Sequence, residues 1–369
     1  MPRFMVNDPL KVDPRARIRV ENFTAAADVV APRRDFIRTT GDNALAVDAG
    51  VTVTLNGSFF VTSLTNLSAA NLDIGSAFVA GTDYYIYLCD PGSNQDEVYL
   101  ISLNATAPAG FTAFNSRRIG GFHVGIGRRS DAQMRPINTA GVAYGAGWET
   151  NIFTGIIPAS VWTLKHRPAC SPEGMVYLGG NVWVDIYLAS DDGAGGLQSV
   201  QNAIPLTGTE GLHWYAFNER AFVVGKRMLT HSEWLKAAMG APQGNAADNL
   251  NAWSQTTNTA RRNTGLVDRA VSSLGCRDTT GNVWEWIDEF ISRYLATGEE
   301  AAQQTWSWHD VLGEGMGQAH MNATRQLVAL GVGGIWRHGV HAGARAVICL
   351  LWPWRVASDV GVRLACESL

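Results

Sequence analysis

Residues 225–240 read GKRMLTHSEWLKAAMG, and this stretch carries the clearest helix signal in the chain. Thr230 has a side-chain oxygen suited to the N-cap position, and Glu233 follows it at the spacing of a capping box. Gly240 suits the left-handed backbone that often ends a helix. The sequence therefore predicts one helix within Leu229–Gly240.

The segments on either side of this helix predict strands and loops. Upstream, Gly174–Ser190 reads GMVYLGGNVWVDIYLAS and contains two β-rich runs around a Gly-Gly pair. Residues 241–280 are rich in Asn, Thr, Gly and Ala and predict long loops held by packing. The following TTGNVWEWIDEF places Trp284 and Trp286 at alternate positions of an extended segment, which favours core packing.

The N-terminal part of the chain predicts an all-β domain. Val51–Thr62 alternates around Asn56-Gly57, a pair that favours the two-residue turn of a β-hairpin. Tyr84–Leu88 and Glu97–Leu103 read as two further strands joined by a turn. Short strands at this spacing are typical of a β-sandwich.

A shift in composition indicates where the domains divide. All 13 tryptophans lie from Trp148 onward, which places a domain boundary near residues 128–160, where GRRSDAQMRPINTAGVAYGAG reads as a polar linker that contains glycine. A chain of 369 residues is also long for one hydrophobic core. We therefore expect an N-terminal arm or attachment segment over 1–34, a β-sandwich over 35–145 and a second domain over 146–369.

The overall composition excludes several classes of protein. A hydrophobic content of 46% with 17% charged residues is typical of a globular protein. The net charge of −4 provides no electrostatic basis for binding nucleic acid or an anionic membrane. No apolar run has the length of a membrane span, and the first residues lack the apolar region of a secretory signal. Synthesis in the cytoplasm without membrane insertion is expected.

The five cysteines predict neither a disulfide scaffold nor a zinc site. They are odd in number and widely scattered, and no two of them form a CxxC pair. Free cysteine behaves as a small apolar residue. Buried free thiols are the expectation.

The ordered motifs resemble a known fold. The two β-rich runs, the GKRMLTHSEW helix, the GNVWEW segment and the closing GGIW…GARAV…VGVRLAC are similar to the formylglycine-generating-enzyme type of C-type lectin fold over residues 170–366. Ala80–Asp90 and Arg117–Gly125 extend the likeness over residues 35–369 to the phage tropism determinants, the variable receptor-binding proteins of diversity-generating retroelements. The resemblance implies a mainly β fold, a β-sandwich followed by an α+β C-type-lectin-like domain, and a homotrimer on a phage tail fibre.

Two other functions of this superfamily find little support in the residues. Formylglycine-generating enzymes bind copper through two cysteines just before the segment that matches GARAV, whereas here Gly343–Ala346 are followed by Cys349 alone. A calcium-dependent lectin needs clustered side-chain oxygens, and Trp352-Pro353-Trp354 offers none. His338 and His341 lack an apparent third ligand for a metal. We expect no catalytic residue, no metal and no cofactor.

The C-terminal segment is where the resemblance implies variation. The retroelement changes adenine-rich codons, which cannot introduce Trp, Met, Lys, Gln or Glu. Residues 335–366 contain no Lys, Glu, Met or Gln, although these make up 35 of the 369 residues, so about three are expected there by proportion. The spacing of the family's repeat predicts the following variable positions: Ile335, Arg337, His338, His341, Ile348, Leu350, Leu351, Arg355, Ala357, Ser358 and Asp359.

Fixed residues separate these positions. Trp336, Gly343, Arg345, Pro353, Gly361 and Arg363 are expected to form the frame, with Arg345 and Arg363 tied to carboxylates such as Glu285. Trp352 and Trp354 cannot arise by this mutation, so we predict that they line the site and are the same in every variant. We therefore expect a hypervariable face over about residues 335–360 that binds a protein or glycan receptor on a target cell. The alternative is that this apolar run is a pair of core strands.

Overall fold

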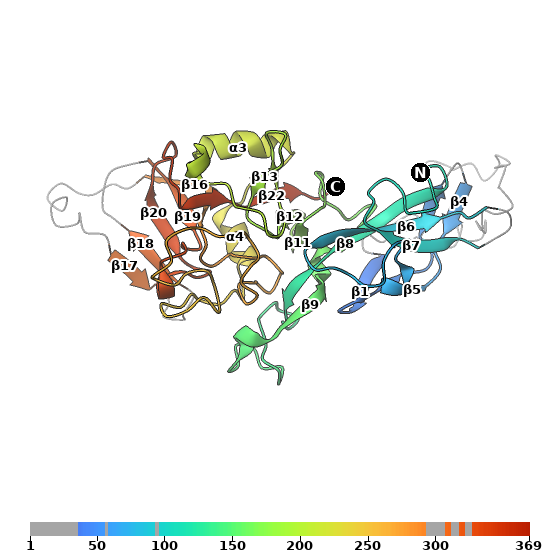
Figure 1. Cartoon of the computed structure of the whole chain (residues 1–369), viewed down its shortest axis with the longest axis horizontal. Helices are drawn as coiled ribbons and strands as arrows, with labels where there is room; N and C mark the ends of the chain where they lie inside the picture. The colour runs from blue at the N-terminus through green and yellow to red at the C-terminus, as the bar shows by residue number, and fades with distance from the viewer. Residues whose placement is uncertain (1–35, 56–57, 93–95, 293–306, 311–316, 322–326) are drawn as a thin grey trace, which may run out of the picture. The chain divides into compact units, whose positions relative to one another are not determined.

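The computed structural model describes residues 36–55, 58–92, 96–292, 307–310, 317–321 and 327–369. The described backbone divides into two compact units (Figure 1). The first comprises residues 36–79, 83–123 and 161–167, and the second comprises 80–82, 124–160 and the described residues of 168–369. The predicted arm of residues 1–34 lies outside the described residues.

The first unit consists of antiparallel strands. One sheet has the order β1 (Ile37–Gly41), β2 (Ala44–Val47) and β5 (Thr65–Ser68). The predicted hairpin is formed by β3 (Thr52–Leu55) and β4 (Ser58–Val61), and its turn residues 56–57 lie outside the described residues. A larger sheet has the order β10 (Trp162–Thr163), β8 (Ser116–Arg128), β6 (Thr82–Cys89) and β7 (Val98–Ser102).

Apolar side chains from these strands form the core of the first unit. Leu45 on β2, Ile86 on β6 and Ile101 on β7 are fully buried. β3 alternates between buried and more exposed positions, which is the pattern of a strand with one face on a core. The predicted β-sandwich is confirmed.

The region expected to be a linker is instead an ordered part of the second unit. It contains β9 (Ile152–Ile156), which pairs with residues 124–128 of β8. The buried Arg128 guanidinium donates to the carbonyl oxygens of Val271 at 2.9 Å and Arg269 at 2.8 Å. The prediction was wrong because a polar, glycine-bearing composition does not reveal hydrogen bonds to residues more than a hundred positions away.

Besides β9 and the end of β8, the described residues of the second unit form two sheets and a short hairpin. The smaller sheet has the order β11 (Met175–Gly179), β12 (Val182–Asp185), β22 (Leu364–Glu367) and β15 (Arg227–Met228). The larger has the order β17 (Ser307–Asp310), β18 (Gln318–Met321), β20 (Val347–Leu351), β19 (Leu327–Val332), β16 (Trp284–Ser292) and β21 (Val360–Val362). The hairpin pairs β13 (Ser190–Asp191) with β14 (Leu197–Gln198).

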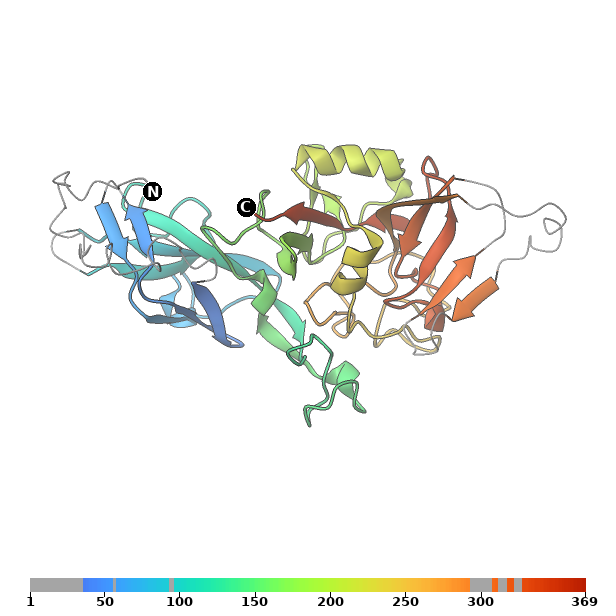
Figure 2. The same cartoon turned by 180° about the vertical axis from the view of Figure 1, so that it is seen from behind.

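Two α-helices pack on these strands (Figure 2). α3 (Trp214–Val223) contacts β14 and β15, whereas α4 (His231–Ala237) contacts β11 and β16. The capping box of α4 is confirmed, because the Thr230 hydroxyl accepts from the Glu233 N–H at 3.3 Å and the Glu233 carboxylate accepts from the Thr230 N–H at 2.9 Å. α4 ends before Gly240, whose φ of 76° lies beyond the Ala238 C-cap.

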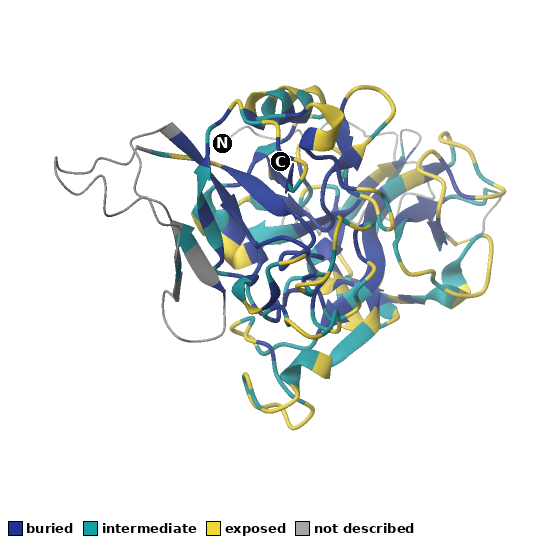
Figure 3. Ribbon diagram, turned by 60° about the vertical axis from the view of Figure 1, so that its left-hand side comes forward, coloured by how far each residue is buried: buried dark blue, intermediate teal, exposed yellow. Residues whose placement is uncertain are grey.

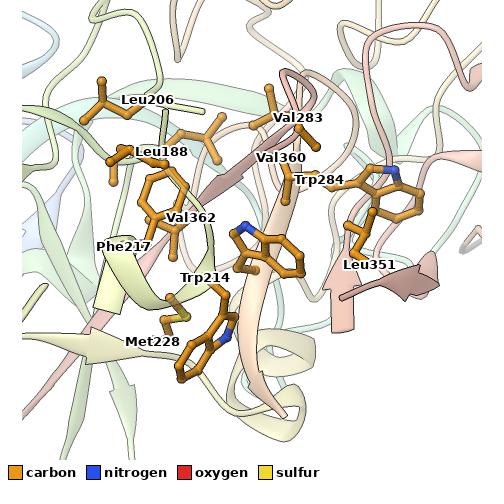
Figure 4. Close-up of a cluster of buried hydrophobic side chains, with 14 of the residues drawn as sticks. Leu188, Leu206, Trp214, Phe217, Met228, Val283, Trp284, Leu351, Val360 and Val362 are labelled. Carbon is orange, nitrogen blue, oxygen red and sulfur yellow. The ribbon is translucent and has the colours of Figure 1, made fainter. Parts of the chain in front are cut away.

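The predicted loops and core tryptophans are also confirmed. Residues 241–283 contain neither helix nor strand beyond isolated bridges. Trp284 and Trp286 are each 1% exposed and belong to a core cluster with Trp214, Phe217 and Val362 (Figure 4). In Figure 3, buried residues follow the central strands of this unit, while exposed residues concentrate in loops. The mainly β architecture of both units agrees with the prediction.

A buried ion pair connects the closing strands to β16. The Arg363 guanidinium donates to both carboxylate oxygens of Glu285, at 2.9 and 3.0 Å, and the Trp234 indole donates to the same carboxylate at 3.1 Å. Burial raises the pKa of Glu285, and the positive charge of Arg363 opposes this effect. The structural role expected for Arg363 is confirmed.

The five cysteines are all free thiols, as expected. Cys89, Cys276 and Cys366 are buried. The expectation of burial was wrong for Cys170 and Cys349, which are partly exposed. Cys170 lies in the loop before β11, and Cys349 is on β20 beside the buried Ile348.

Candidate binding face

The backbone of residues 333–343 is held by the long loops that precede β16. The Gly339 N–H donates to the Ser254 carbonyl at 2.6 Å, and the Trp336 N–H donates to the Asn282 carbonyl at 3.0 Å. These main-chain bonds do not depend on the identity of the side chains at neighbouring positions. The loops therefore position this segment while leaving its side chains free to differ.

The turn after β20 is anchored to α3. The Trp214 N–H at the start of α3 donates to the Pro353 carbonyl at 3.0 Å. Within the turn, the Arg355 N–H donates to the Trp352 carbonyl at 2.9 Å. The Arg355 guanidinium carbon lies 5.2 Å from the centre of the Trp352 ring, a distance that permits a cation–π contact. Trp354 in the same turn is 59% exposed.

The last part of the segment packs closely on a short 3₁₀ helix, η4 (Gly208–Glu210). The Gly208 N–H donates to the Ala357 carbonyl at 3.0 Å, and a Cβ at Gly208 would meet the Ala357 nitrogen at 2.2 Å. Only glycine allows this approach. Asp359 is held similarly, since its carbonyl accepts from the Trp284 N–H at 2.9 Å.

The predicted variable positions fall into two groups by burial. Seven are exposed or half-buried: Arg337, His338, His341, Leu350, Arg355, Ser358 and Asp359. The other four, Ile335, Ile348, Leu351 and Ala357, are at most 8% exposed and belong to the main core cluster. Figure 4 shows Leu351 in this cluster near Trp284. The first group is accessible from solvent, whereas the second packs in the core beneath it. The predicted fixed aromatics Trp352 and Trp354 are half-buried and exposed, respectively.

The alternative that the segment is simply a pair of core strands applies to only part of it. β20 lies between β18 and β19, and its Ile348 and Leu351 face the core. Leu350 on the same strand is half-buried, and the residues on both sides of β20 form loops. The segment therefore has a core side and an exposed side.

Sequence reasoning missed one aromatic residue of this region. Trp308 on β17 lies outside the predicted variable segment, and its ring stacks on His341 at 4.5 Å between centroids and on His320 at 4.2 Å. The His338 ring meets Trp308 edge-on at 5.0 Å. Each side chain is partly buried. The alternation of Trp and His in SWHD could have suggested a strand, but not its position beside residues 338–341.

Burial keeps the histidines of this cluster in their neutral form. Desolvation lowers the pKa of His338 to about 3, with smaller contributions from His320, Arg337 and His341. The His338 Nδ1 accepts a hydrogen bond from the Ile335 N–H at 3.3 Å, which also requires an unprotonated nitrogen. The pKa values of His320 and His341 are lowered mainly by desolvation as well.

The histidines do not form a metal site. Their rings are arranged around the faces and edge of Trp308 and do not converge on one point. Within the part of the chain that the structure describes, no group of three or more His, Cys, Asp or Glu side chains is placed to hold a metal ion. None of the helices in the described segments has the length and apolar character needed to cross a bilayer.

Comparison with known proteins places this geometry in a family. Two family models match the chain. The first is described as "Mtd second domain" and matches residues 35–149, and the second describes a sulfatase-modifying factor enzyme 1-like domain and matches residues 163–368. A tail fiber receptor-binding protein of Bordetella phage BPP-1 is 27% identical over 355 residues, which cover 89% of this chain and 81% of the relative.

Solved structures agree with the sequence comparison. The U1 and M1 variants of the Major Tropism Determinant are each 25% identical and cover 90% of this chain and 83% of their own, with TM-scores of 0.65 and 0.64. The sulfatase-modifying factor match spans more than half of the 369 residues. The chain therefore belongs to the family of the sulfatase-modifying factor enzyme 1-like domain, which it carries together with an Mtd second domain.

Proposed function

We propose that this chain is a receptor-binding protein that displays a variable face on a rigid C-type-lectin fold. The face comprises Trp308, the exposed and half-buried positions of residues 337–359, and the fixed Trp352 and Trp354. Its ligand is a protein or glycan receptor on the surface of a target cell, and its role is recognition without catalysis. The name of the phage relative, a receptor-binding tail fibre protein, supports this proposal.

One observation carries the proposal. The main chain of the segment is bound at Gly339, Trp336, Pro353 and Ala357 by residues outside it, while seven of the predicted variable side chains retain access to solvent. A backbone that is already ordered loses little further entropy when a ligand binds. Aromatic and arginine side chains dominate the energy of many interfaces, and Trp354 and Arg337 are of these types.

The two alternative functions lack the required side chains. The copper chemistry of formylglycine-generating enzymes needs two thiolates, but Gly343–Ala346 supply none and Cys349 supplies one, so that donor set does not fit. A calcium lectin needs clustered oxygen ligands, and the exposed turn at residues 352–354 consists of Trp, Pro and Trp. Within the face only the neighbouring Ser358 and Asp359 carry side-chain oxygens, and the other side chains are mainly rings, guanidinium groups and aliphatic groups.

The same proposal includes assembly and location. A homotrimer on a virion tail fibre would present several copies of the face, and multivalent display raises the avidity of weak individual sites. Variation by a diversity-generating retroelement, and domain limits of 35–145 and 146–369, belong to this proposal. A second, adenine-rich copy of the coding region for residues 335–366 near a reverse transcriptase gene is the expected genetic signature.

A cell-binding experiment tests the function. The labelled full chain is incubated with a panel of bacterial strains, and bound fluorescence is measured by flow cytometry. For a strain that binds, Trp354→Ala and Arg337→Ala are each expected to lower the affinity about tenfold or more, the range of interface hot spots. Phe222→Ala is the matched control, because Phe222 is 67% exposed on α3 outside the segment.

Two outcomes would contradict the proposal. One is binding that is unaffected by both face variants but lost in Phe222→Ala. The other is failure to bind any strain of a broad panel together with absence of a template copy of residues 335–366 from the surrounding genome.

A further inference from the structure

Two cysteines far apart in the sequence lie opposite each other within the second unit. Residues 168–170 run antiparallel to the end of β22, with Pro168 paired to Ser368 and the Ala169 N–H donating to the Glu367 carbonyl at 2.8 Å. This register places Cys170 across from Cys366. The Cys170 N–H accordingly donates to the Cys366 sulfur at 3.2 Å.

The register matches the geometry of a disulfide. Directly opposed residues at non-hydrogen-bonded positions of an antiparallel pair have Cα atoms about 4.5 Å apart. Disulfides join residues whose Cα atoms are about 4.4–6.8 Å apart. Cys170 and Cys366 come directly after the hydrogen-bonded Ala169–Glu367 position, and the 3.2 Å contact between the Cys170 nitrogen and the Cys366 sulfur holds the two residues close together.

The surroundings favour the second exchange step, in which a Cys366 thiolate attacks a mixed disulfide at Cys170. A hydrogen bond from the Cys170 thiol lowers the pKa of Cys366 to about 6, and the same bond raises the pKa of Cys170. The buried Lys226 ammonium, paired with Asp185 at 2.6 Å, adds a positive charge that lowers the pKa of Cys170. Cys170 is partly exposed and Cys366 is buried, so a reagent from solvent reaches Cys170 first.

We propose that Cys170 and Cys366 form a cross-strand disulfide when the protein meets a small-molecule disulfide in an oxidising medium. In the first exchange, the Cys170 sulfur bonds to one sulfur of the reagent, and the other sulfur leaves with the Cys170 proton as a thiol. In the second, the Cys366 thiolate attacks the Cys170 sulfur and displaces the remaining half of the reagent as a thiolate. The two cysteines are oxidised, and the reagent is reduced to two thiols.

The bond would fasten the two ends of the lectin-fold part of the chain. Cys170 precedes β11, the first strand of the smaller sheet, and Cys366 lies on β22, the last strand. A cross-link that closes such a long loop restricts the unfolded chain strongly. Oxidation is therefore expected to raise the Tm by about 5–10 °C. Neither cysteine belongs to the proposed binding face.

The experiment counts thiols in the full chain before and after oxidation. The protein is reduced, freed of reductant and treated with oxidised glutathione. Intact mass, maleimide labelling under denaturing conditions and peptide mapping then follow. The expected result is a loss of about 2 Da in mass and a linked peptide pair that contains Cys170 and Cys366. The number of thiols that react with maleimide should fall by two from the five of the reduced protein. Dithiothreitol should reverse all three changes.

Variants separate this pair from the other thiols. Cys170→Ser and Cys366→Ser should each abolish the 2 Da loss and the rise in Tm, whereas Cys349→Ser should retain both. Cys349 is the matched control because it is also partly exposed on a sheet strand. A glutathione adduct that persists on Cys170, a link between other cysteines, or a mass increase from a bound soft metal would each overturn the proposal.

Discussion

At the scale of single residues, the same side-chain types perform different tasks in different surroundings. Trp284 and Trp286 are buried in the core, whereas Trp354 is 59% exposed and Trp308 stacks between two histidines. The sequence distinguished the first pair from the others by their alternating spacing in GNVWEW. It could not place Trp308, because the position of β17 beside residues 338–341 depends on strand pairing.

The first prediction concerns the pH dependence of stability. The pKa of His338 is lowered to about 3 in the folded protein, while an unfolded histidine has a pKa near 6.5. The unfolded state therefore binds more protons between these values, so His338 contributes stability above about pH 6.5 that is lost as the pH falls. We expect the free energy of unfolding to fall by about 1–2 kcal/mol between about pH 7.5 and pH 5 from this residue.

Urea unfolding at the two pH values checks this expectation. His338→Asn should reduce the difference, since the Asn oxygen can still accept from the Ile335 N–H without titrating. Phe222→Ala, a non-titrating change at an exposed position of α3 outside the cluster, should leave the difference unchanged. An equal pH dependence in the wild type and His338→Asn would show that the cluster does not titrate in this way.

The second prediction concerns the buried ion pair. Arg363→Ala leaves the fully buried Glu285 carboxylate without its bidentate partner. We expect a loss of about 3–5 kcal/mol in the free energy of unfolding. Chemical unfolding followed by tryptophan fluorescence measures it. Arg337→Ala, which removes an exposed arginine, should change stability by less than about 0.5 kcal/mol.

At the scale of elements, the short helix α4 depends on its cap. The helix spans only seven residues, His231–Ala237, so few internal hydrogen bonds support it. Its capping box was evident in the sequence because both partners are three residues apart. Its end was less evident, since Gly240 lies in a left-handed turn beyond the actual C-cap.

The third prediction follows from this cap. Thr230→Ala removes the acceptor for the Glu233 N–H, and we expect a loss of about 1 kcal/mol in the free energy of unfolding. Thr230→Ser keeps the hydroxyl and should lose much less. Thermal unfolding of the three proteins compares them. Equal losses for Ala and Ser would indicate that the threonine methyl group, and not its hydrogen bond, matters.

The fourth prediction concerns the tolerance of β20 and its flanking loops. Ile348 and Leu351 lie in the core, so polar substitutions there should unfold the second unit, and Leu351→Ala should cost about 2–5 kcal/mol. Leu350, Ser358 and Arg337 are at least partly exposed and should accept polar residues. Randomising each position separately and selecting for folded protein measures this difference. Equal acceptance of charged residues at Leu351 and Ser358 would contradict it.

At the scale of the whole molecule, two units form from a chain whose segments interleave. Residues 80–82 and 124–160 group with the C-terminal unit, although they lie within or beside N-terminal sequence. The tryptophan distribution suggested a boundary in this region. It could not reveal that β9 pairs with the end of β8.

The fifth prediction tests recognition by the assembled protein. Because the proposed face offers side-chain oxygens only at Ser358 and Asp359, too few to hold Ca²⁺, binding to a target cell should be unchanged by EDTA. If the chain is a trimer, light scattering should give about three chain masses, and avidity should exceed that of one site. Loss of binding on chelation, with recovery on adding Ca²⁺, would favour the calcium-lectin alternative.

The sequence by itself determined the local structure and the order of the motifs. The capping box at Thr230, the hairpin at residues 51–62 and the alternating tryptophans of GNVWEW follow from short-range geometry that adjacent residues specify. Only the tertiary structure decided which side chains of residues 335–359 are exposed. That segment has no single helical or strand period, so burial depends on contacts with distant residues such as Trp214, Gly208 and Asn282. The pairing of Cys170 with Cys366 was invisible in the sequence for the same reason, since strand register across such a separation is fixed only when the sheet forms.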